Sequence, residues 1–207
     1  MTDRNRYEDR ILDAACKQFS ALGYYGSRVD AIALTANLNK RMVYEYSHTK
    51  EGLYLAVLSN VSNKLLSILH EALPKDATYH NLVDVYQKAL DVLDYYEEFT
   101  RLWTWEVMTP TIHGPRILET SHAIFEHIKE IIVKNAHIAN GSPISDETFD
   151  LIKSMIHSHL LTCAMYTGGS NDSDEETDIS AHKLKCKSLV QTNRKLLLDA
   201  ISEQLAK

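Results

Sequence analysis

The sequence predicts an all-α fold, and its composition, its few chain breakers and its periodicity each indicate this. The chain has 207 residues, of which 44% are apolar, so it can bury a sizeable core. It contains only seven Gly and four Pro, and alternating runs of Val, Ile and Thr are nearly absent, which favours helix over strand. Apolar residues recur every three or four positions along most of the chain. We predict about nine helices.

The first helix is predicted over residues 3–22. Gly23 follows it and is expected to end it, because glycine commonly stops helices. The apolar stripe of this helix has spacings of four, four, four and three, and consists of Tyr7, Ile11, Ala15, Phe19 and Leu22.

A second, short helix is predicted after residues 23–26. Ser27 is followed three residues later by Asp30, which resembles a capping box at a helix start. We expect Ser27 to be the N-cap of this helix, which lasts about two turns. Its predicted apolar face consists of Val29, Ile32, Ala33 and Ala36.

A tight turn and two further helix starts follow. Asn37 and Leu38 are expected to form the turn, because Asn tolerates a left-handed backbone. Asn39 is predicted to cap a third helix that runs to about residue 46. Thr49 is predicted to cap a long connecting helix over about residues 50–73, which ends before Pro74.

Later helices are expected to be separated by Pro- and Gly-containing segments. The polar, acidic segment at residues 168–178 is interpreted as a mobile loop. The helical patterns cover about residues 79–96, 97–109, 115–139, 146–167 and 181–206.

Charge and cysteine usage limit the possible partners and compartment. The formal net charge is -6, but residues 1–50 carry a net +2 and the remainder a net -8, so an anionic partner is expected at the amino-terminal end. The first ten residues lack the apolar core of a signal peptide, and no later run resembles a membrane span. We expect a cytoplasmic protein with no membrane partner. Its cysteines lack C-x-x-C spacing and are expected to be reduced thiols, namely Cys16, Cys163 and Cys186.

The short helix, turn and following basic helix have the pattern of a helix-turn-helix, whose second helix enters the major groove of DNA. That helix carries Lys40, Arg41 and Tyr44. Arginine can pair with guanine, and lysine and tyrosine can reach phosphate oxygens. A generic helical hairpin would show the same periodicity, so the pattern alone leaves both interpretations open.

The residues in this region carry a family resemblance. Residues 11–58 read ILDAACKQFSALGYYGSRVDAIALTANLNKRMVYEYSHTKEGLYLAVL. This segment resembles, without gaps, the amino-terminal domain of TetR-family transcriptional regulators. The resemblance implies a three-helix helix-turn-helix DNA-binding domain at residues 1–50. It also implies a larger helical ligand-binding and dimerisation domain at residues 51–207.

The resemblance also implies roles for single residues. Arg41 stands where many members carry glycine, so it is our candidate for reading a base. Simpler interpretations are that Tyr44 packs in part, that Lys40 is solvated and that Met42 belongs to the core. The DNA-binding residues implied are Arg28, Asn39, Lys40, Arg41, Met42, Tyr44, Tyr46 and Lys50.

Two positions depart from the family pattern. Asn37 replaces a glycine, which is a mild change because Asn also adopts the left-handed conformation. Ser47 replaces a phenylalanine that is usually buried, and truncating such a ring in a fixed core costs about 3 to 5 kcal/mol. Either neighbouring side chains refill the space, or the recognition helix is held less rigidly.

The resemblance further implies that the remaining residues form a homodimer through the last two helices and bind a small-molecule effector. Glu106 lies in an apolar stretch and needs a partner, such as a cationic ligand, Arg101 or His113. An ordinary core would show the same pattern of bulky residues. The pocket candidates are Tyr86, Trp103, Glu106, Phe125, Met155, His159 and Tyr166.

Other functions are weakly supported by the sequence. His157 and His159 are two residues apart and so face different sides of a helix, while His122, Glu126 and His127 have a more plausible spacing for a metal. We predict no metal, because there is no Cys cluster. We also predict no cofactor and no enzyme activity, because no nucleophile elbow, P-loop, dinucleotide fingerprint or H-E-x-x-H motif is present. The alternatives kept are a regulator whose carboxy-terminal domain binds a protein partner, and an α-helical His/Glu enzyme.

Overall fold

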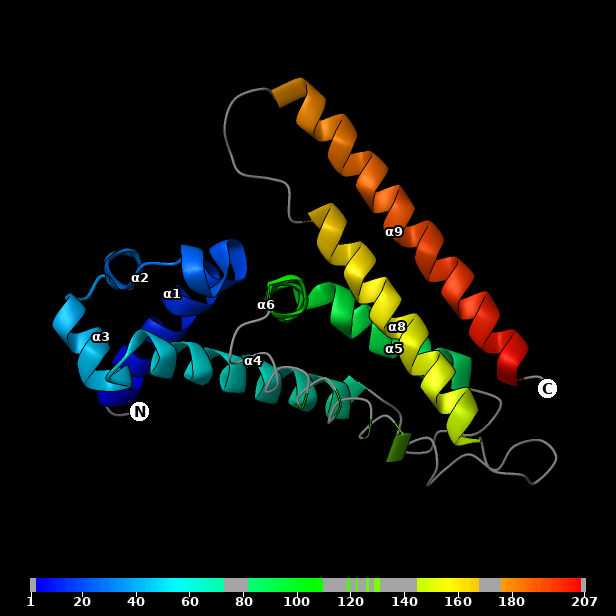
Figure 1. The fold of residues 1–207 in the computed structure, drawn as a ribbon, viewed down its shortest axis with the longest axis horizontal. Coiled ribbons are helices and arrows are strands. Elements are labelled where there is room, and N and C mark those ends of the chain that lie inside the picture. Colours follow the sequence, from blue (N-terminus) through cyan, green and yellow to red (C-terminus); the bar gives the residue numbers. More distant parts are fainter. Residues whose placement is uncertain are drawn as a thin grey trace. The chain divides into compact units, whose positions relative to one another are not determined.

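The computed structural model describes residues 3–72, 82–109, 145–167 and 176–205, together with residues 119, 122, 126, 129 and 130 (Figure 1). Within these ranges the chain forms eight α-helices and no strand, which confirms the all-α prediction. The helix predicted over 115–139 lies almost wholly outside the described residues. The helices are α1 (Asp3–Gly26), α2 (Val29–Thr35), α3 (Lys40–Ser47), α4 (Lys50–Ala72), α5 (Leu82–Tyr95), α6 (Glu97–Met108), α8 (Asp146–Thr167) and α9 (Glu176–Leu205).

The chain divides into two compact units. The first unit comprises Met1–Ser67 and Tyr96–Thr120, and it contains α1, α2, α3, most of α4, and α6. The second unit comprises Ile68–Tyr95 and Ser121–Lys207, and it contains the end of α4 with α5, α8 and α9.

The regular helix of α1 breaks at Gly23, as predicted, and a short helical segment continues beyond this kink to Gly26. Gly23 has φ 67° and ψ 179°, a conformation that is essentially restricted to glycine. A Cβ atom at this position would lie 2.8 Å from Cδ2 of Trp105, so the indole ring of α6 occupies the space that a side chain would need. The Trp105 Nε1 group also donates a hydrogen bond of 3.1 Å to the Ser20 carbonyl. The kink thus seats α6 against α1.

The predicted capping role of Ser27 is wrong. Arg28 occupies the N-cap position of α2, and no side chain caps this helix. The Ser27 hydroxyl instead lies 2.7 Å from the Gly23 carbonyl oxygen and 2.9 Å from that of Gln18. The kink at Gly23 brings these carbonyls within reach, so the hydroxyl stabilises the end of α1. Asp30 stands in the first turn of α2, where a carboxylate complements the helix dipole.

The turn between α2 and α3 has the geometry that its asparagines predicted. Asn37 adopts φ 52°, in the left-handed region. The Asn39 side chain accepts a hydrogen bond of 2.9 Å from the Met42 amide and so caps α3. Helices α2 and α3 thereby form a helix-turn-helix, which is visible at the amino-terminal end of the chain in Figure 1.

A second tight turn joins α3 to α4. His48 adopts φ 61°, and the predicted cap is present, because Thr49 Oγ1 accepts a 2.9 Å hydrogen bond from the Gly52 amide. The Ser47 carbonyl oxygen would lie only 2.3 Å from a Cβ atom at Gly52. The half-buried Ser47 hydroxyl donates to the Val43 carbonyl at 3.0 Å. Ser47 therefore bonds back to its own helix at the position where the family carries a ring.

Helix α4 supplies much of the core of the first unit. Among the described residues it is the helix that is long and apolar enough to cross a membrane, by length and composition alone. A core helix of a globular protein passes the same test. We interpret α4 as such a helix, because its apolar side chains are buried against the rest of the protein. They are Leu53, Tyr54, Val57, Leu58, Val61, Leu65 and Leu69.

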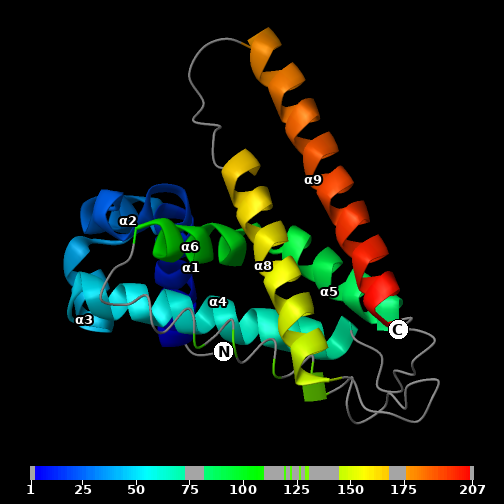
Figure 2. The same cartoon turned by 45° about the vertical axis from the view of Figure 1, so that its right-hand side comes forward.

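A polar network links the three helices of the second unit. His159 of α8 is fully buried, and its Nε2 atom lies 3.0 Å from Oδ1 of Asp94 on α5. Arg194 of α9 donates to Oδ2 of the same carboxylate at 2.9 Å, and it also bonds to Asp91. Figure 2 shows α8 and α9 side by side. The network satisfies the half-buried Asp94 carboxylate and sets the register between α5, α8 and α9.

Helix α9 begins at Glu176, five residues before the predicted start at 181. The last residues of the segment interpreted as a loop, 176–178, are therefore helical, and residues 168–175 lie outside the described part of the chain. Acidic residues suggested a loop, but at a helix amino terminus they complement the dipole and favour the helix.

Candidate nucleic-acid interface

The outward face of α3 carries the basic and aromatic residues. Val43 is fully buried and anchors the helix, while Met42 is half-buried. The Arg41 side chain is 86% exposed, and the side chain of Lys40 is 49% exposed. Tyr44 stands on the same exposed side. Because Val43 is buried and its neighbours are exposed, α3 presents a solvent-exposed face that carries two cations and a phenol.

Each of these two cations is paired with an acid of the protein. Lys40 Nζ lies 2.8 Å from Oδ1 of Asp30 on α2, and this hydrogen bond raises the pKa of Lys40. Arg41 Nε lies 2.8 Å from Oε1 of Glu45, one turn later on α3. The Lys40 ammonium also lies 6.0 Å from the centre of the Tyr44 ring. The spacing of four residues indicates the Arg41–Glu45 pair, whereas Asp30 reaches Lys40 from another helix.

The remaining predicted contact residues lie in different environments. Arg28 is exposed at the start of α2, and Asn39 is exposed at the start of α3. Tyr46 is half-buried, and its pKa is raised by burial and by the carboxylates of α1. Lys50 Nζ lies 4.7 Å from the centre of the Tyr24 ring, and burial lowers its pKa. Tyr46 and Lys50 therefore also contribute to the packing of the first unit.

Arg10 is a positioning residue that sequence reasoning missed. It lies on α1, and its Nη2 atom donates to the Ala36 carbonyl at 2.5 Å and to the Asn37 carbonyl at 3.0 Å. These carbonyls belong to the end of α2 and the turn, where backbone acceptors lack helical partners. The guanidinium thus holds the turn that sets the direction of α3. No local signal marks it, because the partners are 26 and 27 residues away.

Two of the predicted pocket residues are buried in the first unit. Glu106 is 4% exposed, and the Tyr54 hydroxyl donates a hydrogen bond to it. Tyr54 is 52 residues away in sequence and is not among the partners expected for this acid. The Tyr54 ring contacts the Phe19 ring edge-on at 4.8 Å between centroids, and burial raises the pKa of Tyr54. Trp103 is 3% exposed. This cluster joins α1, α4 and α6.

The other predicted pocket residues fall in the second unit or outside the described part. Tyr86 is 1% exposed, its hydroxyl has no hydrogen-bond partner among the described residues, and burial raises its pKa. His159 is bound to Asp94, and Met155 is half-buried on the same helix. Phe125 and the side chain of Tyr166 lie outside the described residues.

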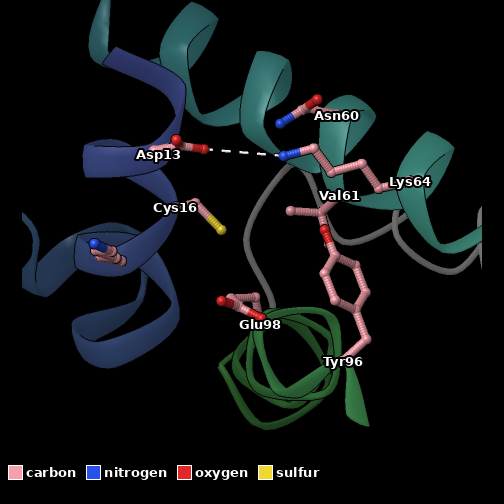
Figure 3. A pocket seen from close by; sticks show the side chains of 8 residues that line it. Asp13, Cys16, Asn60, Val61, Lys64, Tyr96 and Glu98 are labelled. Carbon is pink, nitrogen blue, oxygen red and sulfur yellow. Dashed lines mark ion pairs between the residues drawn. The ribbon is translucent and has the colours of Figure 1, made fainter. Parts of the chain in front are cut away.

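A cavity of about 150 Å³ lies within the first unit, between α1, α4 and the start of α6 (Figure 3). Burial, reinforced by Glu98, raises the pKa of the Cys16 thiol to about 12. Burial and the neighbouring thiol likewise raise the pKa of Tyr96 to about 12. Both groups are protonated at neutral pH, so the cavity offers no activated nucleophile. Its lining residues are Asp13, Cys16, Lys17, Asn60, Val61, Lys64, Tyr96 and Glu98.

Known protein sequences resemble this chain in the region that contains the helix-turn-helix. Residues 11–57 match the family of bacterial regulatory proteins named tetR. The HTH-type transcriptional repressor NicS of Pseudomonas putida is 42% identical over 57 residues, which are 28% of this chain and 27% of NicS. The HTH-type transcriptional regulator RutR of Escherichia coli is 31% identical over 98 residues, 47% of this chain and 46% of RutR. The matched segments span less than half the length of these curated relatives.

Solved structures resemble the chain over nearly its whole length. A TetR-like transcriptional regulator from Rhodococcus superimposes with a TM-score of 0.62 and 18% identity, over 97% of this chain and 96% of that chain. The transcriptional regulator FadR of Bacillus subtilis, solved in complex with stearoyl-CoA, gives a TM-score of 0.65 and 18% identity, over 92% of this chain and 97% of that chain. At this identity the likeness shows a shared fold.

Proposed function

We propose that this chain, whose residues 11–57 match the tetR family of bacterial regulatory proteins, is a regulator of that family and regulates transcription in the cytoplasm by binding a double-stranded DNA operator through α3. The observation that carries this proposal is the free face of α3, with Lys40, Arg41 and Tyr44 exposed around a buried Val43. Exposed cations on a short helix that follows a tight turn suit insertion into the major groove.

The proposed roles of the side chains follow from their chemistry. Lys40 and Tyr44 contact phosphates, and Arg41 reads guanine through O6 and N7. Arg28 stands at the start of α2, beside amide groups that attract phosphate.

Replacing Arg41 by alanine should cost about 1 to 3 kcal/mol in binding and relax the preference at one base of each half-site. Equal losses on every sequence would make Arg41 a phosphate contact.

The regulator is proposed to act as a homodimer through α8 and α9. Leucines on these helices are exposed in the single chain, and burying them against a second copy would be favourable. Leu189 and Leu196 are seven residues apart and so lie on one side of α9, while Leu151 lies on α8. Two-fold symmetry then requires a palindromic operator, with half-sites about 34 to 36 Å apart or a multiple of that distance.

Repression is proposed to be relieved by a small, largely apolar effector. FadR, which shares the fold, was solved with stearoyl-CoA bound. In the second unit the hydroxyl of Tyr86 is buried and has no hydrogen-bond partner among the described residues, so it suits contact with such a ligand. A hundredfold preference of the effector for the DNA-incompetent state corresponds to about 2.7 kcal/mol. The other contacts proposed in this unit are Phe125, Met155, His159 and Tyr166.

Selection from a random pool of double-stranded DNA tests the proposal. The purified protein should enrich one palindromic sequence, and its affinity for that sequence should fall steeply as salt rises, because phosphate contacts release counterions. An effector should then weaken binding to the enriched operator without unfolding the protein. A pool that yields no palindrome after repeated rounds would overturn the assignment.

A further inference from the structure

Glu45 is the single acidic residue of α3, and it stands on the exposed face that we assign to DNA. Its side chain is 60% exposed, and Oε1 accepts a 2.8 Å hydrogen bond from Nε of Arg41. A carboxylate at this place is repelled by the phosphates of an approaching duplex. Affinity for DNA alone therefore does not account for it.

Stability of α3 does not account for Glu45 either. The residue lies in the last turn of the helix, where a negative charge opposes the dipole. Arginine precedes glutamate in this pair, which is the less favourable order at a spacing of four residues. An exposed ion pair of this kind contributes little free energy of folding.

The geometry of the hydrogen bond gives Glu45 a different use. A guanidinium has five N–H donors in a rigid fork. The bond to Glu45 uses the Nε donor of Arg41 and fixes the plane of the group, while both terminal nitrogens keep their four N–H donors. Two such donors are what bidentate pairing with O6 and N7 of guanine requires. Lys40 differs, because its single ammonium is paired with Asp30 on another helix and acts as a point charge.

We infer that Glu45 is a positioning residue for base reading, which orients Arg41 toward guanine and lowers affinity for sites that lack guanine. The inference rests on the proposed function, because it assigns a role within the same interface. At a site with guanine, the Arg41 contact offsets the repulsion between Glu45 and phosphate. At other sites the repulsion remains and no base contact compensates for it.

The test measures two quantities separately, the overall affinity for DNA and the preference for guanine. A merely structural role of Glu45 would not separate them. The operator enriched by the wild type is compared by fluorescence anisotropy with operators changed at each guanine and with unrelated DNA. For Glu45→Ala we expect binding to unrelated DNA to strengthen by roughly fivefold at low salt. We expect the preference for one guanine in each half-site to fall by about fivefold or more, toward that of Arg41→Ala.

Three further variants sharpen the comparison. Glu45→Gln keeps the shape and an acceptor but loses the charge, so it should show most of the gain in affinity and part of the loss in discrimination. The double variant Arg41→Ala/Glu45→Ala should discriminate no worse than Arg41→Ala alone. Asp30→Asn frees Lys40 instead and should change binding to all sequences by the same factor. Circular dichroism confirms that each variant is folded, and Glu45→Gln decides the question if Glu45→Ala does not fold.

Two results would overturn the inference. If both Glu45 variants bind all DNA more tightly with an unchanged guanine preference, Glu45 acts only as a repelling charge, although the proposed function stands. If the wild type enriches no operator, both the proposed function and the role of Glu45 are wrong.

Discussion

Cys16 lies half-buried in the wall of the cavity of the first unit, and its chemistry is set by that environment. Burial, followed by the Glu98 carboxylate, raises the pKa of its thiol from 9.0 to about 12. The folded protein therefore keeps a proton on this sulfur that the unfolded chain loses above about pH 9. This difference stabilises the folded state below pH 9, and the stabilisation is lost as pH rises toward 12.

Alkylation of Cys16 is expected to be slow and to keep accelerating across the alkaline range. In the variant Cys163→Ser/Cys186→Ser, the rate with iodoacetamide should rise about tenfold per pH unit from pH 8 to pH 10, because the reactive thiolate remains a minor species. In urea, the alkylation rate of the same variant should level off near pH 9. A plateau near pH 9 in the folded protein would show that the thiol ionises normally.

Residues with local partners could be predicted from the sequence, whereas residues with distant partners could not. Asn37, Asn39 and Thr49 act within a few residues of themselves, and the structure confirms the left-handed turn and both caps. Ser27 was placed wrongly, because its partner is a carbonyl exposed by the kink at Gly23. Arg10 was missed because its acceptors lie on another helix.

At the scale of helices, periodicity located most elements, but their ends depend on tertiary contacts. Helix α4 is described to Ala72, close to the predicted end at 73. Helix α1 breaks at Gly23 as predicted, but the short segment that continues to Gly26 and the packing of Trp105 on the kink were not predicted. Of the candidate site, the exposed cations of α3 followed from sequence, but the pairing of Lys40 with Asp30 on another helix required the fold.

The contact between α1 and α6 makes Gly23 a position where substitution should be costly. Gly23→Ala is expected to lower the free energy of unfolding by roughly 2 to 4 kcal/mol, since it strains the backbone and displaces a rigid indole. Urea denaturation measures the change. Gly26→Ala is the matched control, because a Cβ there meets only Leu22 Cβ at 3.2 Å. Equal losses for the two variants would mean that the kink carries no special requirement.

At the scale of the whole molecule, the proposed operator binding depends on two copies acting together. A single α3 can make few contacts with DNA. When two recognition helices are linked in one dimer, binding of the second becomes an intramolecular step. The exposed leucines of α9 are the proposed link between the two copies. Disrupting them should therefore weaken binding to the full operator but leave recognition of a single half-site unchanged.

Leu189→Glu/Leu196→Glu is therefore expected to give a folded monomer whose affinity for the palindromic operator falls by roughly two orders of magnitude. Light scattering measures the mass, and anisotropy measures affinity for the full operator and for one half-site. Affinity for the half-site should change little, because α3 is untouched. Tyr95→Glu is the control, since Tyr95 is 82% exposed in the same unit but lies on α5. A double variant that remains dimeric would place the interface elsewhere, whereas a monomer with full operator affinity would show that one copy suffices for recognition.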